Sequence, residues 1–295
     1  MMSLRDQLDQ LADLYSNAND DADALAGEAV YPPGFGPREL AETAIAMMDL
    51  TTLEATDTPS RVRELCRTAK RPDDDACPPV AAVCTYPDLV PAAACELAGS
   101  PVRVASVAGA FPAGRAPLHV KLSDARSAIN AGADEIDVVM DRGAFLEGNE
   151  QAVFDHLRAM KDLTRTSAGA DVLMKVILET GELELYSRIH RASWLAMLAG
   201  ADFIKTSTGK IDAGACLPAV IVMLRAVRDF EAHTDRHVGV KASGGIRRAE
   251  DAARYMAAVH AVAGSRALSA ERFRFGASSL LRDLLEYRAR AATPG

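Results

Sequence analysis

Eight short apolar runs, about 30 residues apart and separated by helical patterns, limit the folds open to this chain more than any other feature. Each run is rich in Val, Ile, Ala or Phe and has the length of a buried strand. Strands that alternate with helices indicate parallel βα units, and eight of them favour a closed (β/α)8 TIM barrel over an open α/β sheet of seven or eight strands. The runs are AIAMMDL (44–50), VAAVCTY (80–86), VRVASV (102–107), EIDVVM (135–140), VLMKVILE (172–179), FIKTST (203–208), VGVKAS (238–243) and FRFGAS (273–278).

The segments between the runs carry apolar residues at helical spacing. In the helix predicted over 149–167, Asn149 is expected to be the N-cap, and Glu150 suits the first turn. These clearest helices are predicted over 118–133, 149–167, 185–201 and 217–233.

Residues 1–37 precede the repeat and form a predicted helical extension, and residues 38–295 form the predicted barrel domain. Within the extension, residues 3–15 have the pattern of an amphipathic acidic helix, and 31–36 (YPPGFG) are a turn-rich break. The extension is interpreted as a packing cap in preference to an oligomer contact. Residues 70–79 are polar and contain proline, which predicts a surface loop.

Composition argues against several classes of protein. The formal net charge is -8 and there is no basic stripe, so a nucleic-acid partner is not expected. No run approaches the ~20 apolar residues of a membrane span, and the acidic N-terminal sequence does not resemble a secretory signal. The five cysteines are odd in number and include no C-x-x-C pair, which favours a reduced cytoplasmic protein.

Several polar residues lie inside the apolar runs or at their ends. Active sites of barrels lie at the C-terminal ends of the strands, so these residues are candidates for a site. A buried charge is costly unless it is paired, and several in one layer indicate a shared polar pocket. A structural ion pair is the alternative, and Asp137 with Lys175 on neighbouring strands would suit it. The candidates are Asp49, Cys84, Asp137, Lys175, Lys205 and Lys241.

Lys205 and Lys241 lie on consecutive predicted strands, so their side chains can approach each other. A nearby like charge and loss of solvent both disfavour a protonated amine, and they produce the neutral nucleophile that a Schiff base needs. Arginine stays protonated and cannot take this role. The chain contains 26 arginines but only 7 lysines, which makes lysine in these strands informative.

The last units carry small residues where helices begin. Gly244 and Gly245 follow the seventh run, and Ser278 and Ser279 follow the eighth. Backbone N–H groups at helix starts bind phosphate, often after strands seven and eight of a barrel, and Lys210 after Gly209 would add a positive charge. A tight turn and an ordinary helix cap are the alternative interpretation.

Metal chemistry has little support in the sequence. The six histidines are scattered, and the pair at His233 and His237 falls before the seventh strand, at the expected bottom of the barrel. These two are interpreted as surface or structural residues, and no metal site is expected.

Eight segments together resemble the deoxyribose-phosphate aldolase family, over about 41–285 and in the family's order. They are MMDLTTL, VAAVCTYPDLV, VRVASVAGAFPAG, GADEIDVVM, LMKVILETGEL, GADFIKTSTGK, VGVKASGGIR and RFRFGASSLL. The resemblance implies a (β/α)8 barrel and a class I aldolase without metal or cofactor. The implied reaction is reversible cleavage of 2-deoxy-D-ribose 5-phosphate to D-glyceraldehyde 3-phosphate and acetaldehyde.

The resemblance also implies roles for particular residues. Lys205 is the expected Schiff-base lysine, with Lys241 as the second lysine. Asp137, rather than Asp134, is the expected essential acid, beside Lys175. The implied substrate-binding residues are Asp49, Cys84, Thr208, Gly209, Lys210, Gly244, Gly245, Ser278 and Ser279.

Two other functions stay open at this point. Another Schiff-base lyase acting on a different phosphorylated sugar would keep the lysine pair. A non-catalytic phosphosugar-binding barrel would need no nucleophilic lysine. The expected partners are small phosphorylated sugars and aldehydes, and a homodimer is expected because barrels of this type often form dimers.

Overall fold

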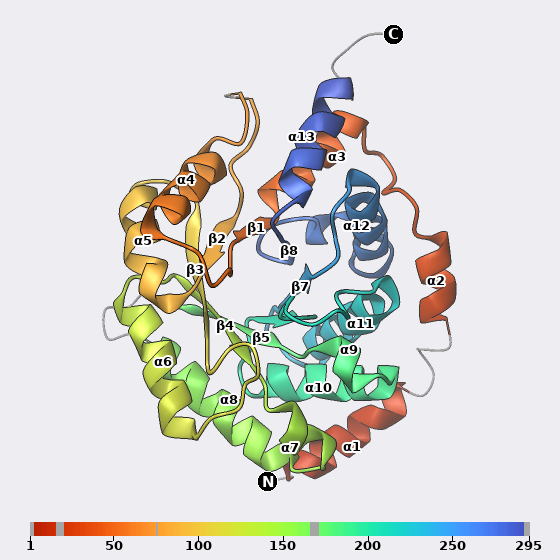
Figure 1. Ribbon diagram of the computed structural model, residues 1–295. Coiled ribbons are helices and arrows are strands. Elements are labelled where there is room, and N and C mark those ends of the chain that lie inside the picture. The colour runs from red at the N-terminus through yellow and green to blue at the C-terminus, as the bar shows by residue number, and fades with distance from the viewer. Residues whose placement is uncertain (1–2, 16–20, 75, 166–170, 292–295) are drawn as a thin grey trace.

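The computed structural model describes residues 3–15, 21–74, 76–165 and 171–291, without the side chains of 11–15. Its eight strands are all parallel and close into a barrel in sequence order, with β8 pairing with β1 (Figure 1). The predicted (β/α)8 barrel is confirmed. The strands are β1 (Met48–Thr51), β2 (Ala82–Thr85), β3 (Arg103–Ala108), β4 (Glu135–Val139), β5 (Leu173–Ile177), β6 (Phe203–Lys205), β7 (Gly239–Ser243) and β8 (Phe273–Ala277).

Helices surround the barrel, and further helices precede β1 or lie in loops (Figure 1). The surrounding helices are α4 (Pro59–Lys70), α5 (Val90–Leu97), α6 (Leu118–Asn130), α8 (Glu150–Thr164), α10 (Tyr186–Leu198), α11 (Leu217–His233), α12 (Ala249–Ala263) and α13 (Leu280–Ala291). The others are α1 (Leu4–Tyr15), α2 (Ala22–Glu28), α3 (Pro37–Ala46), α7 (Arg142–Leu146), α9 (Thr180–Leu183) and the 3-10 turns η1 (Pro87–Leu89) and η2 (Ser265–Ala267).

Several boundaries differ from the predicted ones. Residues 44–46, predicted as the start of the first strand, are the end of α3, a helix that packs against α13 and buries Ala44 and Ile45. Asn149 occupies the N-cap position of α8, but its side chain makes no capping hydrogen bond. The helix expected to end near Gly132 ends at 130, and the helix predicted over 185–201 ends at 198. Each end lies just ahead of a glycine with a positive φ angle, Gly132 and Gly200, which terminates the helix.

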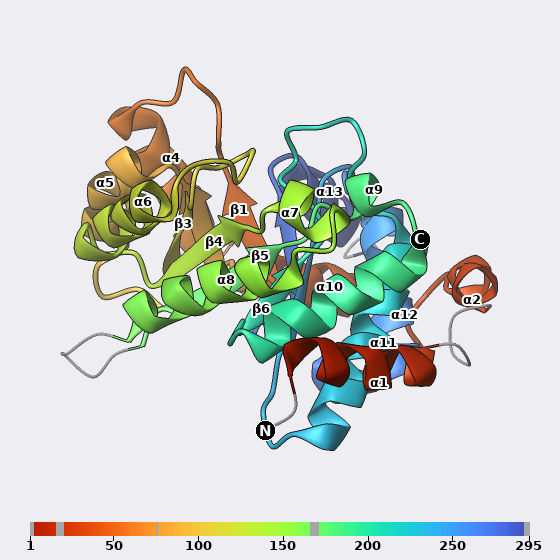
Figure 2. The ribbon, with the colours of Figure 1, turned by 90° about the horizontal axis from the view of Figure 1, so that it is seen from below.

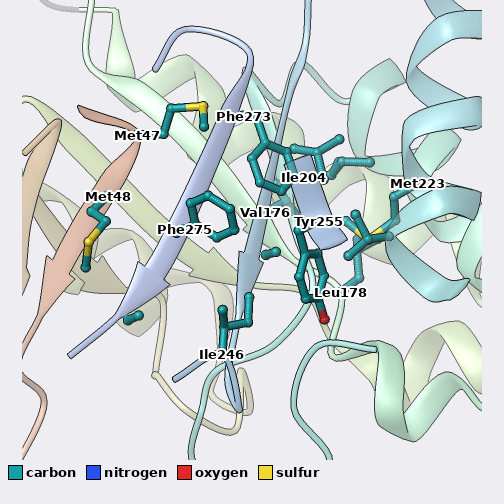
Figure 3. Close-up of a cluster of buried hydrophobic side chains, with 14 of the residues drawn as sticks. Met47, Met48, Val176, Leu178, Ile204, Met223, Ile246, Tyr255, Phe273 and Phe275 are labelled. Atoms are coloured by element: carbon teal, nitrogen blue, oxygen red, sulfur yellow. The ribbon is translucent and has the colours of Figure 1, made fainter. Parts of the chain in front are cut away.

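Strand residues alternate between two environments. Outward-facing residues such as Val176, Ile204 and Phe275 pack with Met223 and Tyr255 of the surrounding helices (Figure 3). Inward-facing residues of β2 and β3 form a separate, small apolar cluster that includes Cys84 and Val107. The remaining interior, formed by the other six strands, contains mostly charged side chains.

The N-terminal helices lie along the outside of the barrel. α1 runs beside α10 and α8, and α2 lies beside α11 and α12 (Figures 1 and 2). Leu8 of α1 is buried, and Asp9 pairs with Arg191 of α10 at 2.8 Å. Asp21, just before α2, pairs with Arg225 of α11 at 2.6 Å. The extension therefore packs on the barrel, as the preferred interpretation predicted.

The loop predicted over 70–79 begins at residue 71, because Lys70 is the last residue of α4, and its described residues (71–74 and 76–79) contact the barrel domain. Asp73 and Asp74 both accept hydrogen bonds from Arg288 of α13, and Cys77 is buried. Within the described parts of the chain, none of the helices has both the length and the apolar character that crossing a bilayer requires.

Candidate active site

Seven charged side chains from six strands meet inside the barrel, and we call them the charged cluster. None of these side chains is more than 4% exposed. Buried charges are energetically costly, so a group as close together as this one is stable only when its members form ion pairs with one another. The members are Asp49, Glu135, Asp137, Lys175, Lys205, Lys241 and Arg274.

Asp137 is the centre of the cluster because three lysines donate to its carboxylate. Lys175 Nζ lies 2.8 Å from Oδ1, and Oδ2 accepts from Lys205 at 2.8 Å and from Lys241 at 2.7 Å. Strand register produces this arrangement, since Asp137 lies opposite Lys175 and Lys205 lies opposite Lys241. Burial alone would raise the pKa of Asp137, but the three cations hold it well below its usual value.

Asp49 and Glu135 form the deeper part of the cluster together with Arg274. Asp49 pairs with Lys241 and Arg274, each at 2.5 Å, and with Lys175 at 3.4 Å. Glu135 pairs with Lys175 at 2.5 Å and with Arg274 at 3.1 Å. Glu135 and Arg274 were missed in the sequence, although each is a charged residue inside a strand run, the same feature that identified the others.

The three lysines of the cluster differ in how easily they lose a proton. Burial lowers the pKa of Lys205, and the positive charge of Lys241 lowers it further. The negative charge of Asp137 raises this pKa but compensates only partly. The pKa of Lys241 is raised despite burial, because two carboxylates contact it. The pKa of Lys175, with three carboxylates, lies well above its ordinary value. Lys205 is therefore the amine of the three that is most easily neutral.

A cavity of about 490 Å³ opens above the charged cluster, between the loops that follow β1, β6, β7 and β8. Lys205 contributes to its lining, and so does Arg247, which the sequence analysis did not single out. The other predicted residues in the lining are Thr208, Gly209, Lys210, Gly244, Gly245, Ser278 and Ser279.

Five predicted residues do not line this cavity but are fully buried in the barrel wall or interior: Asp49, Cys84, Asp137, Lys175 and Lys241. Cys84 packs in the small apolar cluster, and burial raises the pKa of its thiol to about 11. Asp49 makes ion pairs instead of facing the cavity. The sequence therefore predicted that these residues lie near the cavity, but it did not predict how deep in the barrel their side chains lie.

Glycines shape the part of the cavity that faces the helix starts, which we call the glycine rim (Gly209, Gly244, Gly245). All three have φ between +76° and +87°, a conformation that side chains with a Cβ seldom adopt. A Cβ on Gly244 would come within 2.9 Å of Gly214 Cα in the preceding loop, whereas one on Gly245 would meet no atom within 4 Å. With α12 and α13 beginning nearby, the rim offers backbone N–H groups suited to an anion.

A buried glutamate fixes the turn on which Thr208 lies. The Glu179 carboxylate accepts hydrogen bonds from Thr208 N at 3.1 Å and from Thr208 Oγ1 at 2.6 Å, and Lys210 N donates to Thr208 Oγ1 at 3.2 Å. Burial raises the pKa of Glu179, and the Arg142 guanidinium, 3.8 Å from its carboxylate, opposes this shift. Glu179 has φ +56°, and no feature of the sequence signals that left-handed conformation or this contact.

The histidines lie where the sequence interpretation placed them. His233 Nδ1 contacts the carbonyl of Asp229 at 2.7 Å, and the largely exposed His237 lies 3.5 Å from Glu231. Across the described ranges, no three His, Cys, Asp or Glu side chains form a set that could hold a metal ion.

Comparison with known proteins assigns the chain to a family. Residues 43–286 match the model of the DeoC/LacD family aldolases. Over 253 residues the chain is 43% identical to human deoxyribose-phosphate aldolase, covering 82% of this chain and 78% of the human one. A Coccidioides immitis structure, provisionally named a deoxyribose-phosphate aldolase, is 33% identical with a TM-score of 0.71 and covers 92% of this chain and 99% of its own. The tetrameric Aeropyrum pernix deoxyribose phosphate aldolase is 28% identical with a TM-score of 0.67, covering 86% of this chain and 93% of its own. The protein described here belongs to the DeoC/LacD family of aldolases.

Proposed function

We propose that this protein is a deoxyribose-phosphate aldolase, a carbon–carbon lyase that reversibly cleaves 2-deoxy-D-ribose 5-phosphate to D-glyceraldehyde 3-phosphate and acetaldehyde. Identity of 43% to the human enzyme supports this activity. The observation that carries it is the position of Lys205, a buried amine with a lowered pKa that reaches the cavity beside a second lysine. An amine of this kind forms imines with aldehydes.

The reaction begins when Lys205 Nζ attacks the C1 carbonyl of the open-chain sugar to form a carbinolamine. Loss of water gives a protonated imine, which draws electrons from the neighbouring bonds. Removal of the C3 hydroxyl proton breaks the C2–C3 bond, releases D-glyceraldehyde 3-phosphate and leaves an enamine on Lys205. Protonation of the enamine at C2, followed by hydrolysis, releases acetaldehyde and regenerates the amine.

Asp137 and Lys241 are the groups we assign to the proton transfers, through an ordered water. Both lie within hydrogen-bonding reach of the reacting region, since Asp137 contacts Lys205 and Lys241 at 2.8 and 2.7 Å. Lys175 holds Asp137 in place and ionised. We assign Asp49 to orienting Lys241 rather than to touching the substrate, and we assign Cys84 no covalent role.

The substrate phosphate is assigned to the glycine rim with Lys210, Ser278 and Ser279. The three glycines have no side chain that would shield their backbone N–H groups, and Lys210 adds positive charge. Deoxyribose 5-phosphate should therefore be cleaved far more efficiently than unphosphorylated deoxyribose. Equal kcat/KM for the two sugars would contradict the phosphate assignment, and preference for another phosphorylated sugar would favour a different Schiff-base lyase.

Reductive trapping tests the central assignment. The protein is treated with acetaldehyde and borohydride, digested, and analysed by peptide mass spectrometry. We expect an added ethyl group on the peptide that contains Lys205 and none on Lys161, a partly buried lysine already paired with Asp202 at 2.7 Å. Labelling elsewhere, or none, would reject the mechanism.

We also propose a cytoplasmic location and a homodimer. All five cysteines are free thiols, as in a reducing compartment, and burial raises the pKa of Cys66 and Cys77 to about 11.

Sedimentation velocity tests the proposed homodimer, and a monomer across micromolar concentrations would reject it.

A further inference from the structure

The charged cluster has one positive charge too many. It contains four cations, Lys175, Lys205, Lys241 and Arg274, but only three carboxylates, Asp49, Glu135 and Asp137. A buried charge without compensation is strongly unfavourable, so neutrality requires that one cation lose its proton. With Lys205 neutral, three cations balance three carboxylates.

The contacts decide which cation this is. Arg274 cannot lose a proton under ordinary conditions. Among the described residues, Lys175 has three carboxylate partners within 4 Å, Lys241 has two, and Lys205 has only Asp137. Lys205 is also the member that faces the cavity, where a neutral amine can react.

We propose that Glu135 and Arg274 are positioning residues that set the net charge of the cluster and thereby determine the protonation state of Lys205. This inference rests on the proposed function, in which Lys205 forms the imine. Neither residue lines the cavity, and neither touches Lys205. Glu135 and Arg274 lie at the deep end of the barrel and act on Lys205 through the charged side chains that lie between.

Two chains of ion pairs connect them to Lys205. One runs from Arg274 through Asp49 and Lys241 to Asp137. The other runs from Glu135 through Lys175 to Asp137, which contacts Lys205. Because all the links are buried, water screens them little.

A buried aromatic ring packs against Arg274 at the deep end. Arg274 Cζ lies 5.5 Å from the centre of the Phe203 ring, two residues before Lys205 on β6. Gly239 on β7 leaves the space for this ring, since a Cβ there would lie 2.1 Å from Phe203. A change of charge at Arg274 is therefore felt inside the barrel rather than dispersed in water.

Other charged or titratable groups face the cluster from its surroundings. Arg103 of β3 lies 3.8 Å from Glu135 but is half exposed, so solvent screens it. Glu271, before β8, interacts with Arg274 and Arg103. Cys84 of β2 is a neutral thiol at physiological pH. None of these three groups adds a buried negative charge that would neutralise the extra cation of the charged cluster.

Opposite charge changes should move Lys205 in opposite directions. Glu135→Gln removes a negative charge and makes the protonated amine less favourable, so the pKa of Lys205 should fall. Arg274→Met removes a positive charge, so it should rise. A shift of about one pH unit each way is the scale expected of buried charges. The double variant restores the charge count and should return close to wild type.

The experiment measures the initial rate of Lys205 ethylation by acetaldehyde and saturating cyanoborohydride as a function of pH. Only the free amine attacks the aldehyde, so the midpoint reports the protonation of Lys205. Glu135→Gln should lower the midpoint, Arg274→Met should raise it, and Glu135→Asp, which keeps the charge, should leave it unchanged.

Arg288 of α13 supplies the matched control for Arg274. It is similarly buried and pairs with Glu42, Asp73 and Asp74, but on the outside of the barrel. Arg288→Met should lower the denaturation midpoint while leaving the labelling midpoint in place. A general loss of structure would affect both arginine variants alike, whereas a charge effect on Lys205 belongs to Arg274 alone.

The outcomes separate this inference from the proposed function. If wild-type Lys205 is not labelled, the proposed function fails. If it is labelled but the Gln and Met variants keep its midpoint, or shift it in the same direction, the charge-balance inference fails and the function stands. If Arg274→Met does not fold, the comparison of Glu135→Gln with Glu135→Asp decides, and equal midpoints would reject the inference.

Discussion

Two buried carboxylates close to the cavity exist in opposite electrostatic environments. Asp137, in the charged cluster, is surrounded by three lysines that hold its pKa well below the usual value. Glu179, beside the glycine rim, is held by the N–H and hydroxyl of Thr208, and burial raises its pKa. Asp137 is suited to taking part in charge and proton transfer, whereas Glu179 is suited to fixing backbone.

The difference extends to the regions around them. The charged cluster acts through side chains whose charges are balanced against one another inside a dry barrel. The glycine rim acts through backbone groups whose positions depend on left-handed φ angles. Changes of charge should therefore damage the first region, and changes of shape the second.

The largest effect is expected from Lys205→Arg. This substitution replaces the amine that can form an imine with a guanidinium that stays protonated, so the chemistry stops. It also gives the charged cluster four permanent cations against three carboxylates, so the free energy of unfolding should fall as well. Turnover of deoxyribose 5-phosphate should fall by on the order of 10⁴-fold or more. Steady-state kinetics check this, with Lys161→Arg as a control that keeps activity. Substantial residual turnover would remove Lys205 from the reaction.

The next effect is expected from Asp137→Asn, which leaves Lys175, Lys205 and Lys241 without their shared carboxylate. Turnover should fall by about 10²–10⁴-fold through lost proton transfer. The free energy of unfolding should also fall, by about 3–5 kcal/mol, because buried cations lose their partner. Urea denaturation measures the second effect. A variant as stable as wild type would show that Asp137 does not hold the cluster together.

Sequence reasoning reached the barrel and the lysines for a physical reason. Period and composition reveal strands, and a charged residue inside an apolar strand is conspicuous because burying it is costly. The same rule applied to Glu135 and Arg274 would have completed the cluster. What the sequence did not predict was depth: Asp49 and Cys84 lie inside β1 and β2, before the strand ends, and both are fully buried away from the cavity. Strand tilt and register set that depth, and neither is visible in one strand.

Contacts between distant loops were harder to predict than the strands. When it pairs with Thr208, Glu179 has a φ angle of +56°, which is unusual for a residue other than glycine. Nothing in the sequence around Glu179 predicts this conformation. The end of α3 was mistaken for strand because Ala44 and Ile45 are apolar in either structure. Local pattern cannot separate a short buried strand from the buried end of a helix.

Two adjacent glycines separate shape from charge in the rim. Both Gly244→Ala and Gly245→Ala introduce strain of about 1–2 kcal/mol at positive φ. Only at Gly244 does the new Cβ also meet backbone, 2.9 Å from Gly214 Cα. We expect KM for deoxyribose 5-phosphate to rise in both variants and more in Gly244→Ala, with the pH midpoint of Lys205 labelling unchanged. A larger effect at Gly245 would contradict the role assigned to the close approach between the two loops.

The smallest effect is a pair of opposite pH dependences of stability. The folded-state pKa of Asp137 is lowered, so its favourable contribution is present above its usual pKa of about 3.8 and is lost as pH falls below it. The folded-state pKa of Glu179 is raised, so its contribution is present below about 4.5 and is lost as pH rises through the folded value. Relative to wild type, Asp137→Asn should be most destabilised near neutral pH, whereas Glu179→Gln should gain stability between about pH 4 and about pH 7.5. Urea denaturation between about pH 2.5 and about pH 5 gives the slope for Asp137→Asn, and between about pH 4 and about pH 7.5 it gives the slope for Glu179→Gln. Slopes of the same sign would remove the contrast between the charged cluster and the glycine rim.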